Sequence, residues 1–221
     1  MPNWCHNHLI IKGNNVQEFI NRCKGKGLAW EGPGSEREKD FTFNALVPIP
    51  KAVLSAIWNA PQPKGYITEQ MLEEAYDNPL QTWLAENWGT YQRDAVDPRI
   101  EVVEGQAEIK FDTAWTPPIE WLIQVSEIFT DLLFEIRYHE YGQGFVGQRR
   151  IRGGKYLAVC YAEIPDFLWY EMMEKFFGYE EIENPDYNPD LAGLEVNSEE
   201  PKTIEELIKK IESVGDKGGN R

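Results

Sequence analysis

The sequence predicts an α+β domain in which helices cover a sheet, and three consecutive segments support this class. Residues 107–113 alternate between side chains suited to a buried face and charged side chains, which is the period of a strand. Residues 119–129 carry apolar side chains at helical spacing, and Thr116 and Pro117 suit the cap and first position of that helix. Residues 132–138 alternate again. This strand, helix and strand need a larger sheet to bury their apolar faces.

The preceding segments predict further elements of the same sheet and an insertion. Residues 8–12 alternate as a short strand, and residues 16–23 follow with apolar side chains on one helical face. Residues 41–45 alternate as a second strand, which Pro48 would end. The stretch 51–90 is helical in pattern but broken by prolines, so we expect a helical insertion.

Two strand pairs complete the predicted sheet. Residues 100–103 and 107–113 predict a hairpin, and residues 149–152 and 155–161 predict an added C-terminal pair with its turn at Gly153. The main elements then follow the order βαββαβ. This order predicts a ferredoxin-like sheet backed by helices.

We expect this domain to occupy residues 1–165 and an acidic, helical extension to occupy residues 166–221. Residues 167–177 and a segment beginning at Thr203 have apolar side chains at helical spacing. The extension holds 15 acidic and 6 basic residues, a net charge of −9, which leaves −6 for the preceding part of the chain. The negative charge therefore concentrates in the extension, where it could engage a basic partner.

Composition predicts a cytoplasmic protein without a cofactor. The 221 residues are 42% hydrophobic, which is enough for a buried core. No run approaches the roughly 18 apolar residues of a membrane span, and the start lacks the features of a secretory signal. Three distant cysteines outline neither a disulfide framework nor a metal motif. The net charge of −15 argues against broad contact with nucleic-acid backbone. Composition does not predict the oligomeric state.

Cys5, His6 and His8 are close enough in the sequence to suggest a zinc site. In a strand, however, His6 and His8 share one face while Cys5 points to the other. No neighbouring motif supplies the remaining ligands. We therefore expect a structural first strand and no metal site.

Tryptophans beside polar residues form a candidate ligand pocket. In a functional interpretation, indole rings would stack on a small ligand while polar side chains fix its edges. In the alternative, which we favour, the tryptophans belong to the core and their N–H groups find carbonyl acceptors. The candidate pocket residues are Trp4, Asn87, Trp88, Arg93, Asp94, Asp112 and Trp115.

A dense basic segment is the candidate nucleic-acid site. Its members are Arg149, Arg150, Arg152 and Lys155, with Tyr156 and Tyr161 beside them. Sheets of this class can stack bases on exposed aromatic side chains while cations contact phosphates. The net charge opposes this interpretation, and the segment could instead pair with the acidic extension of the chain itself. The preceding run G-Q-G-F-V-G matches a dinucleotide fingerprint in letters only, because strand residues follow it rather than a helix.

Five segments in sequence order resemble a known family. They are M-P-N-W-C-H-N at 1–7, F-T-F-N-A-L-V-P-I-P at 41–50, E-N-W-G-T at 86–90, T-A-W-T-P-P at 113–118 and G-Q-G-F-V-G at 142–147. Together they resemble the YubB-type family of plasmid, phage and genomic-island proteins. The resemblance implies a ferredoxin-like domain and a mobile-element origin, and it implies no activity. The family usually continues N-W-G-T with Lys-Trp-Asp, whereas this chain continues with Tyr91-Gln92-Arg93-Asp94.

No complete catalytic constellation is visible in the sequence. Glu140 with His139, and Asp94 with Asp97, are adjacent titratable pairs, but no nucleophile, base and orienting group occur at a recognisable spacing. We therefore expect a non-enzymatic interaction protein of a mobile element, which binds a host protein through its acidic part and could counter host defence. The alternatives are a ligand-binding or catalytic domain with the tryptophan pocket, and nucleic-acid binding through the basic segment.

Overall fold

The computed structural model describes residues 3–27, 37–58, 79–91, 94–164 and 167–178. The strands are β1 Trp4–Lys12, β2 Gly25–Gly27, β3 Arg37–Lys39, β4 Val96–Val103, β5 Gln106–Ala114, β6 Leu133–Glu140, β7 Phe145–Arg152 and β8 Lys155–Glu163. The helices are α1 Val16–Arg22, the 3-10 turn η1 Phe43–Ala45, α2 Lys51–Trp58, α4 Pro79–Asn87, α5 Ile119–Ile128 and α6 Phe167–Phe177. Among these helices, none is both long enough and apolar enough to cross a membrane.

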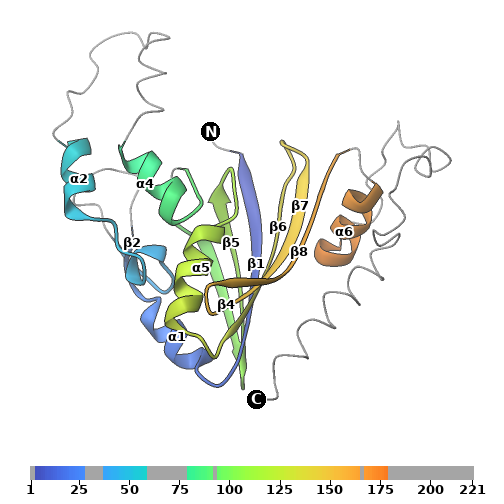
Figure 1. The fold of residues 1–221 in the computed structure, drawn as a ribbon, viewed down its shortest axis with the longest axis horizontal. Helices are drawn as coiled ribbons and strands as arrows, with labels where there is room; N and C mark the ends of the chain where they lie inside the picture. Colours follow the sequence, from blue (N-terminus) through green and yellow to red (C-terminus); the bar gives the residue numbers. More distant parts are fainter. Residues whose placement is uncertain (1–2, 28–36, 59–78, 92–93, 165–166, 179–221) are drawn as a thin grey trace, which may run out of the picture.

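Six strands form one antiparallel sheet in the order β4-β5-β1-β6-β7-β8 (Figure 1). Four of these strands, β1, β4, β5 and β6, combine with α1 and α5 in the βαββαβ topology. The hairpin of β7 and β8 then extends the sheet beyond β6. The predicted ferredoxin-like α+β class is therefore confirmed.

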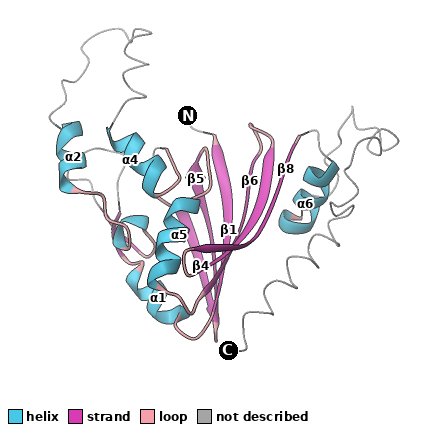
Figure 2. Ribbon diagram, viewed as in Figure 1, coloured by secondary structure: helices cyan, strands magenta, loops and turns pink. Residues whose placement is uncertain are grey.

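One face of the sheet, here called the helix-side face, is covered by α1 and α5 (Figure 2). This face holds most of the core. Leu9, Ile109 and Phe134 project from three neighbouring strands into this core and are fully buried. Phe19 of α1 packs edge-on against Phe134, with ring centroids 5.4 Å apart. Alternation along each strand sends the intervening side chains to the opposite face, here called the outer face.

Residues 41–45 do not form the predicted second strand. Phe41 and Phe43 are both fully buried, but the segment turns through η1, and the side chain of Thr42 accepts a hydrogen bond from the N–H of the second residue after it. The carboxylate of Asp94 accepts hydrogen bonds from the Phe43 N–H and the Thr42 hydroxyl, so a side chain replaces a neighbouring strand as partner. The second strand of the βαββαβ core is instead β4, and the helical insertion precedes it.

On the outer face, α6 packs against β7 and β8 (Figure 1). It forms a small core separate from the main one, consisting of Val146, Cys160, Ala162, Trp169, Met172 and Met173. The predicted helix over residues 167–177 is thus present and lies on the sheet. The predicted helix beginning at Thr203 falls outside the described residues.

Candidate functional site

Trp88 lies inside the core. Its side chain is fully buried and its ring packs edge-on against Phe43. Its Nε1 donates a hydrogen bond of 2.9 Å to the Val47 carbonyl, and Trp121 donates one of 3.0 Å to the Phe43 carbonyl. Both indoles bury a large apolar area and satisfy their N–H groups.

Asp94 is a buried carboxylate with internal partners. It accepts from the Thr42 hydroxyl and, at 2.8 Å, from the backbone N–H groups of Phe43 and Ala95. The ammonium of Lys39 lies 3.9 Å away. Burial raises the pKa of this carboxyl, and Lys39 opposes part of the rise. These contacts hold the segment around η1, and they take the role that pairing with another strand would have in a sheet.

Asn87 and Trp115 lie at the end of the sheet where α4 meets α5. The Asn87 amide donates to the Trp83 carbonyl at 2.9 Å, which ties it to its own helix. Trp115 follows β5 with a positive φ of 71°, and its N–H donates to the Asn3 carbonyl. A positive φ is unfavourable for a bulky side chain.

Trp4 and Asp112 belong to the outer face. Register pairs Trp4 with Ala114 and His6 with Asp112, and alternation places these residues on one side of the sheet. The candidate pocket residues therefore divide among the core, the end of the sheet and the outer face, and Arg93 lies outside the described residues.

A chain of hydrogen bonds connects three separate segments, 1–7, 86–90 and 113–118, at one end of the sheet. Asn7 donates to the Thr113 hydroxyl at 2.9 Å, and that hydroxyl donates to the Thr116 carbonyl at 2.7 Å. The Thr116 hydroxyl then donates to the Gly89 carbonyl at 2.6 Å. Polar residues of three segments thus satisfy one another, which is a structural role.

The two histidines of β1 pair with acids of β5 on the outer face. His6 Nδ1 lies 2.7 Å from Asp112, and His8 Nε2 lies 3.0 Å from Glu108. Cys5 is buried on the helix-side face, as alternation predicts. In the part of the chain that the structure describes, no three His, Cys, Asp or Glu side chains are placed to hold a metal ion.

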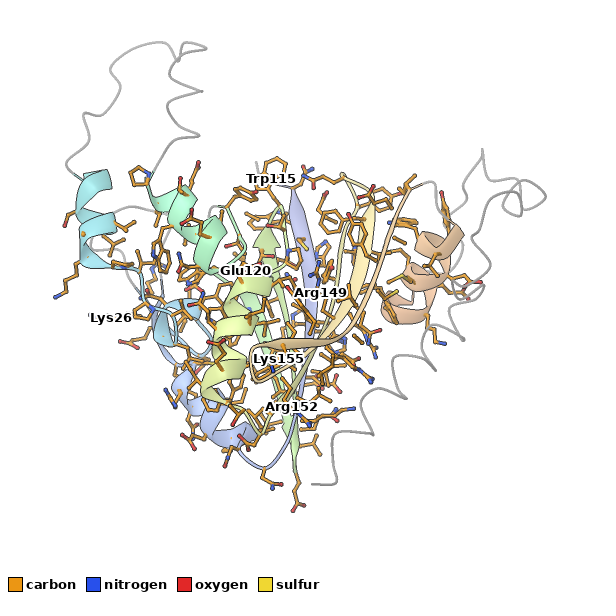
Figure 3. The ribbon with its side chains drawn as sticks, viewed as in Figure 1. Lys26, Trp115, Glu120, Arg149, Arg152 and Lys155 are labelled. Carbon is orange, nitrogen blue, oxygen red and sulfur yellow. The ribbon has the colours of Figure 1, made fainter. Side chains whose placement is uncertain are left out.

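The basic segment divides between the two faces of the sheet. Arg150 points to the outer face and binds Glu135 at 2.8 Å, while Arg137 binds the same carboxylate at 2.7 Å. Burial alone would raise the pKa of Glu135, but the two arginines hold it below its usual value. Arg152 and Lys155 lie at the end of the β7–β8 hairpin (Figure 3).

Arg149 points to the helix-side face, where tyrosines hold it. Its Nε donates to the Tyr138 hydroxyl at 3.2 Å, and its guanidinium lies over the Tyr156 ring, 5.3 Å from the centroid. Tyr138 is buried, and burial raises the pKa of its phenol. A Cβ at Gly147 would stand 2.4 Å from the Tyr138 ring, so only glycine lets that ring lie across β7.

Beside Arg149, three side chains of the edge strand β8 remain accessible. Tyr156, Val159 and Tyr161 are 44%, 48% and 46% exposed. A bulge between the pairs of Arg150 and Ile151 keeps Tyr156 on the face that carries Val159 and Tyr161. We call Tyr138, Arg149, Tyr156, Val159 and Tyr161 the Tyr–Arg surface.

The Tyr–Arg surface combines a positioned cation with accessible aromatic and aliphatic area. Among the described residues, no carboxylate forms an ion pair with Arg149. The sequence alone pointed to Arg149, Tyr156 and Tyr161 but missed Tyr138 and Gly147. A glycine within a strand is a signal of close backbone approach, and here the approaching group is the Tyr138 ring.

Glu140 and His139, one of the titratable pairs in the sequence, have contacts that stabilise the fold. Glu140 accepts hydrogen bonds from the N–H groups of Gly142 and Gln143 and thereby closes the turn after β6. His139 is buried on the outer face, and burial followed by the nearby His6 lowers its pKa to about 4. An imidazole with this pKa is neutral at pH 7.

A family model described as a ferredoxin-like domain in Api92-like protein matches residues 87–181, which include β4 to α6. Among solved structures, the chain is similar to protein api92 from Yersinia pseudotuberculosis, with 11% identity and a TM-score of 0.44 over 76% of this chain and 100% of that chain. No curated protein matches the sequence.

Proposed function

We propose that this chain is a non-enzymatic interaction protein that captures a protein partner on its Tyr–Arg surface. The observation that carries the proposal is the half-exposed row of Tyr156, Val159 and Tyr161 beside Arg149. Tyrosine and arginine are, with tryptophan, the side chains enriched among those that dominate binding energy in protein interfaces.

The side chains of the Tyr–Arg surface are already held in position in the unbound chain. Gly147 allows Tyr138 to lie flat, Tyr138 fixes the Nε of Arg149, and the Tyr156 ring supports its guanidinium. Phe145 stacks on Tyr161 with ring centroids 6.2 Å apart. Side chains that are already ordered lose less conformational entropy on binding, so more of the contact energy appears as affinity.

Charge favours a protein over a nucleic acid as the partner. Contact with a phosphate backbone depends on an excess of Lys and Arg, whereas this chain carries a net charge of −15. Along β8 itself, Lys155 at one end is balanced by Glu163 at the other. A mixed and partly apolar surface of this kind is typical of protein interfaces.

The biological setting is part of the proposal. The YubB-type resemblance of the five segments supports an accessory role in a phage, plasmid or genomic island, where the partner would be a host protein, including one that acts in defence. A basic host protein would also be attracted to the acidic charge of residues 179–221, which lie outside the described residues.

Affinity capture from host cells, followed by titration of the purified partner, tests this proposal. Arg149→Gln and Tyr156→Ala should each weaken partner binding at least about tenfold, which corresponds to a loss of about 1.4 kcal/mol. Arg99→Gln and Tyr91→Ala are matched controls, because both side chains are exposed on other parts of the surface. The proposal fails if all four variants bind the partner like the original chain. It also fails if the captured material is a nucleic acid that nuclease treatment removes.

A further inference from the structure

Arg149 differs from its neighbours in the way its charge is balanced. Arg137 and Arg150 share the carboxylate of Glu135, with contacts of 2.7 and 2.8 Å. Arg149 has instead the hydroxyl of Tyr138 and the ring of Tyr156, neither of which carries a negative charge at pH 7. Within the described residues, the guanidinium of Arg149 is thus a held cation without an anionic counterpart.

The phenols around Arg149 stay neutral, so they do not supply the missing charge. Burial raises the pKa of Tyr138. Burial, followed by the hydrogen bond of its hydroxyl to Glu163, raises the pKa of Tyr161 as well. The surface consequently offers one cation, Arg149, positioned among aromatic side chains, and the Glu163 carboxylate lies beside Tyr161 without pairing with that cation.

We infer that the segment bound by the Tyr–Arg surface is an acidic peptide, in which a carboxylate pairs with Arg149 and flanking apolar side chains cover Tyr156, Val159 and Tyr161. This inference rests on the proposed function and names the chemistry of its partner. A guanidinium that is already oriented pairs with a carboxylate through two parallel hydrogen bonds, which gives direction as well as affinity. The exposed side chains on β8 provide apolar area next to that pair.

The net charge of the whole chain has the same sign as an acidic peptide, so the dependence of binding on salt is informative. A net charge of −15 repels an acidic peptide at long range, while the contact with Arg149 acts locally. Added salt screens the repulsion and disturbs a partly buried pair less. Binding of the peptide should therefore change by less than about threefold between about 50 and 300 mM salt. A single-stranded nucleic acid would instead lose affinity steeply over this range, because phosphate binding releases counterions.

Selection from a displayed library of random twelve-residue peptides tests the inference with the full chain as bait. Peptides selected on the original chain should be enriched in Asp or Glu next to apolar residues, and those selected on Arg149→Gln should lose the acidic position. Tyr156→Ala should reduce binding of the selected peptides whatever their charge, and Tyr91→Ala should not.

The outcomes separate the inference from the proposed function. If selected peptides depend on Tyr156 but carry no acidic residue, the surface binds proteins and the acidic chemistry is wrong. If no selected peptide depends on Tyr156 or Arg149, both are wrong. Replacing the acidic residue of a selected peptide by its amide should weaken binding to the original chain at least tenfold and leave binding to Arg149→Gln unchanged. Equal losses with both proteins would overturn the pairing with Arg149.

Discussion

Two adjacent arginines of β7 show how one residue type serves two roles on the two faces of a sheet. Arg150 points to the outer face and shares Glu135 with Arg137. Arg149 points to the helix-side face, where tyrosines orient it and no described carboxylate pairs with it. The sequence shows both as one basic segment. The sheet separates them into one arginine that pairs with a carboxylate and one that is held by tyrosines.

The largest expected effect comes from removing the shared carboxylate. Glu135→Gln removes the largely buried carboxylate that Arg137 and Arg150 share. Breaking a buried ion pair in this way typically lowers the free energy of unfolding by about 3–5 kcal/mol. Denaturant titration measures the loss. Arg149→Gln is the control and should cost about 1 kcal/mol, since it removes one hydrogen bond to the Tyr138 hydroxyl and leaves no charge unpaired. Equal losses of stability for the two variants would show that the ion pairs of the outer face contribute no more than the contacts of Arg149.

A smaller effect should follow from acid on the outer face. The pKa of His139 falls from 6.5 in an exposed chain to about 4 in the fold, because burial, and then the nearby His6, disfavour the charged imidazole. Around it, His6 approaches from β1 and Phe177 from α6. Between about pH 6.5 and 4, this histidine is therefore protonated in the unfolded chain but largely neutral in the folded chain. The free energy of unfolding should decline by about 3 kcal/mol as pH falls from 6.5 to 4.

The variant His139→Leu isolates this contribution, because it retains an apolar side chain beneath α6 and has no titratable group. Its stability should depend less on pH between 6.5 and 4 than that of the original chain, as measured by denaturant titration at several pH values. Parallel pH profiles for the two proteins would show that His139 does not titrate as described.

The smallest of the three effects concerns the support of the Tyr–Arg surface. Gly147→Ala places a Cβ 2.4 Å from the Tyr138 ring and forces that ring to move. Overpacking of this kind costs about 1–3 kcal/mol. The same change made in Tyr138→Leu should cost less, because the ring that it meets is absent. A double-mutant cycle measures this coupling, and additive losses would contradict the contact.

The fold was largely predictable because alternation and helical spacing are properties of local sequence. The segment 41–45 was the exception, since Phe41 and Phe43 alternate like a strand while their partner is a carboxylate 51 residues from Phe43. Nothing local in the sequence shows that Asp94 substitutes for a strand there.

The candidate site was less predictable because it depends on register. Arg149, Tyr156 and Tyr161 are close in sequence, but the bulge that gathers the tyrosines on one face is visible only in the pairing of β7 with β8. Tyr138 reaches Arg149 from the neighbouring strand β6, and the glycine that admits it lies in the G-Q-G-F-V-G run, which names no partner for it. Long-range pairing of this kind leaves no mark in local periodicity.

The small core beneath α6 contains a cysteine, Cys160, whose reactivity depends on the position of that helix. Cys160 lies there beside Met172, whereas Cys5 and Cys23 belong to the main core on the helix-side face. All three thiols are shielded from solvent, but they are shielded by different elements. The rate at which a thiol reagent modifies Cys160, compared with the other two, therefore measures how often α6 lifts from the sheet while the rest of the domain stays folded.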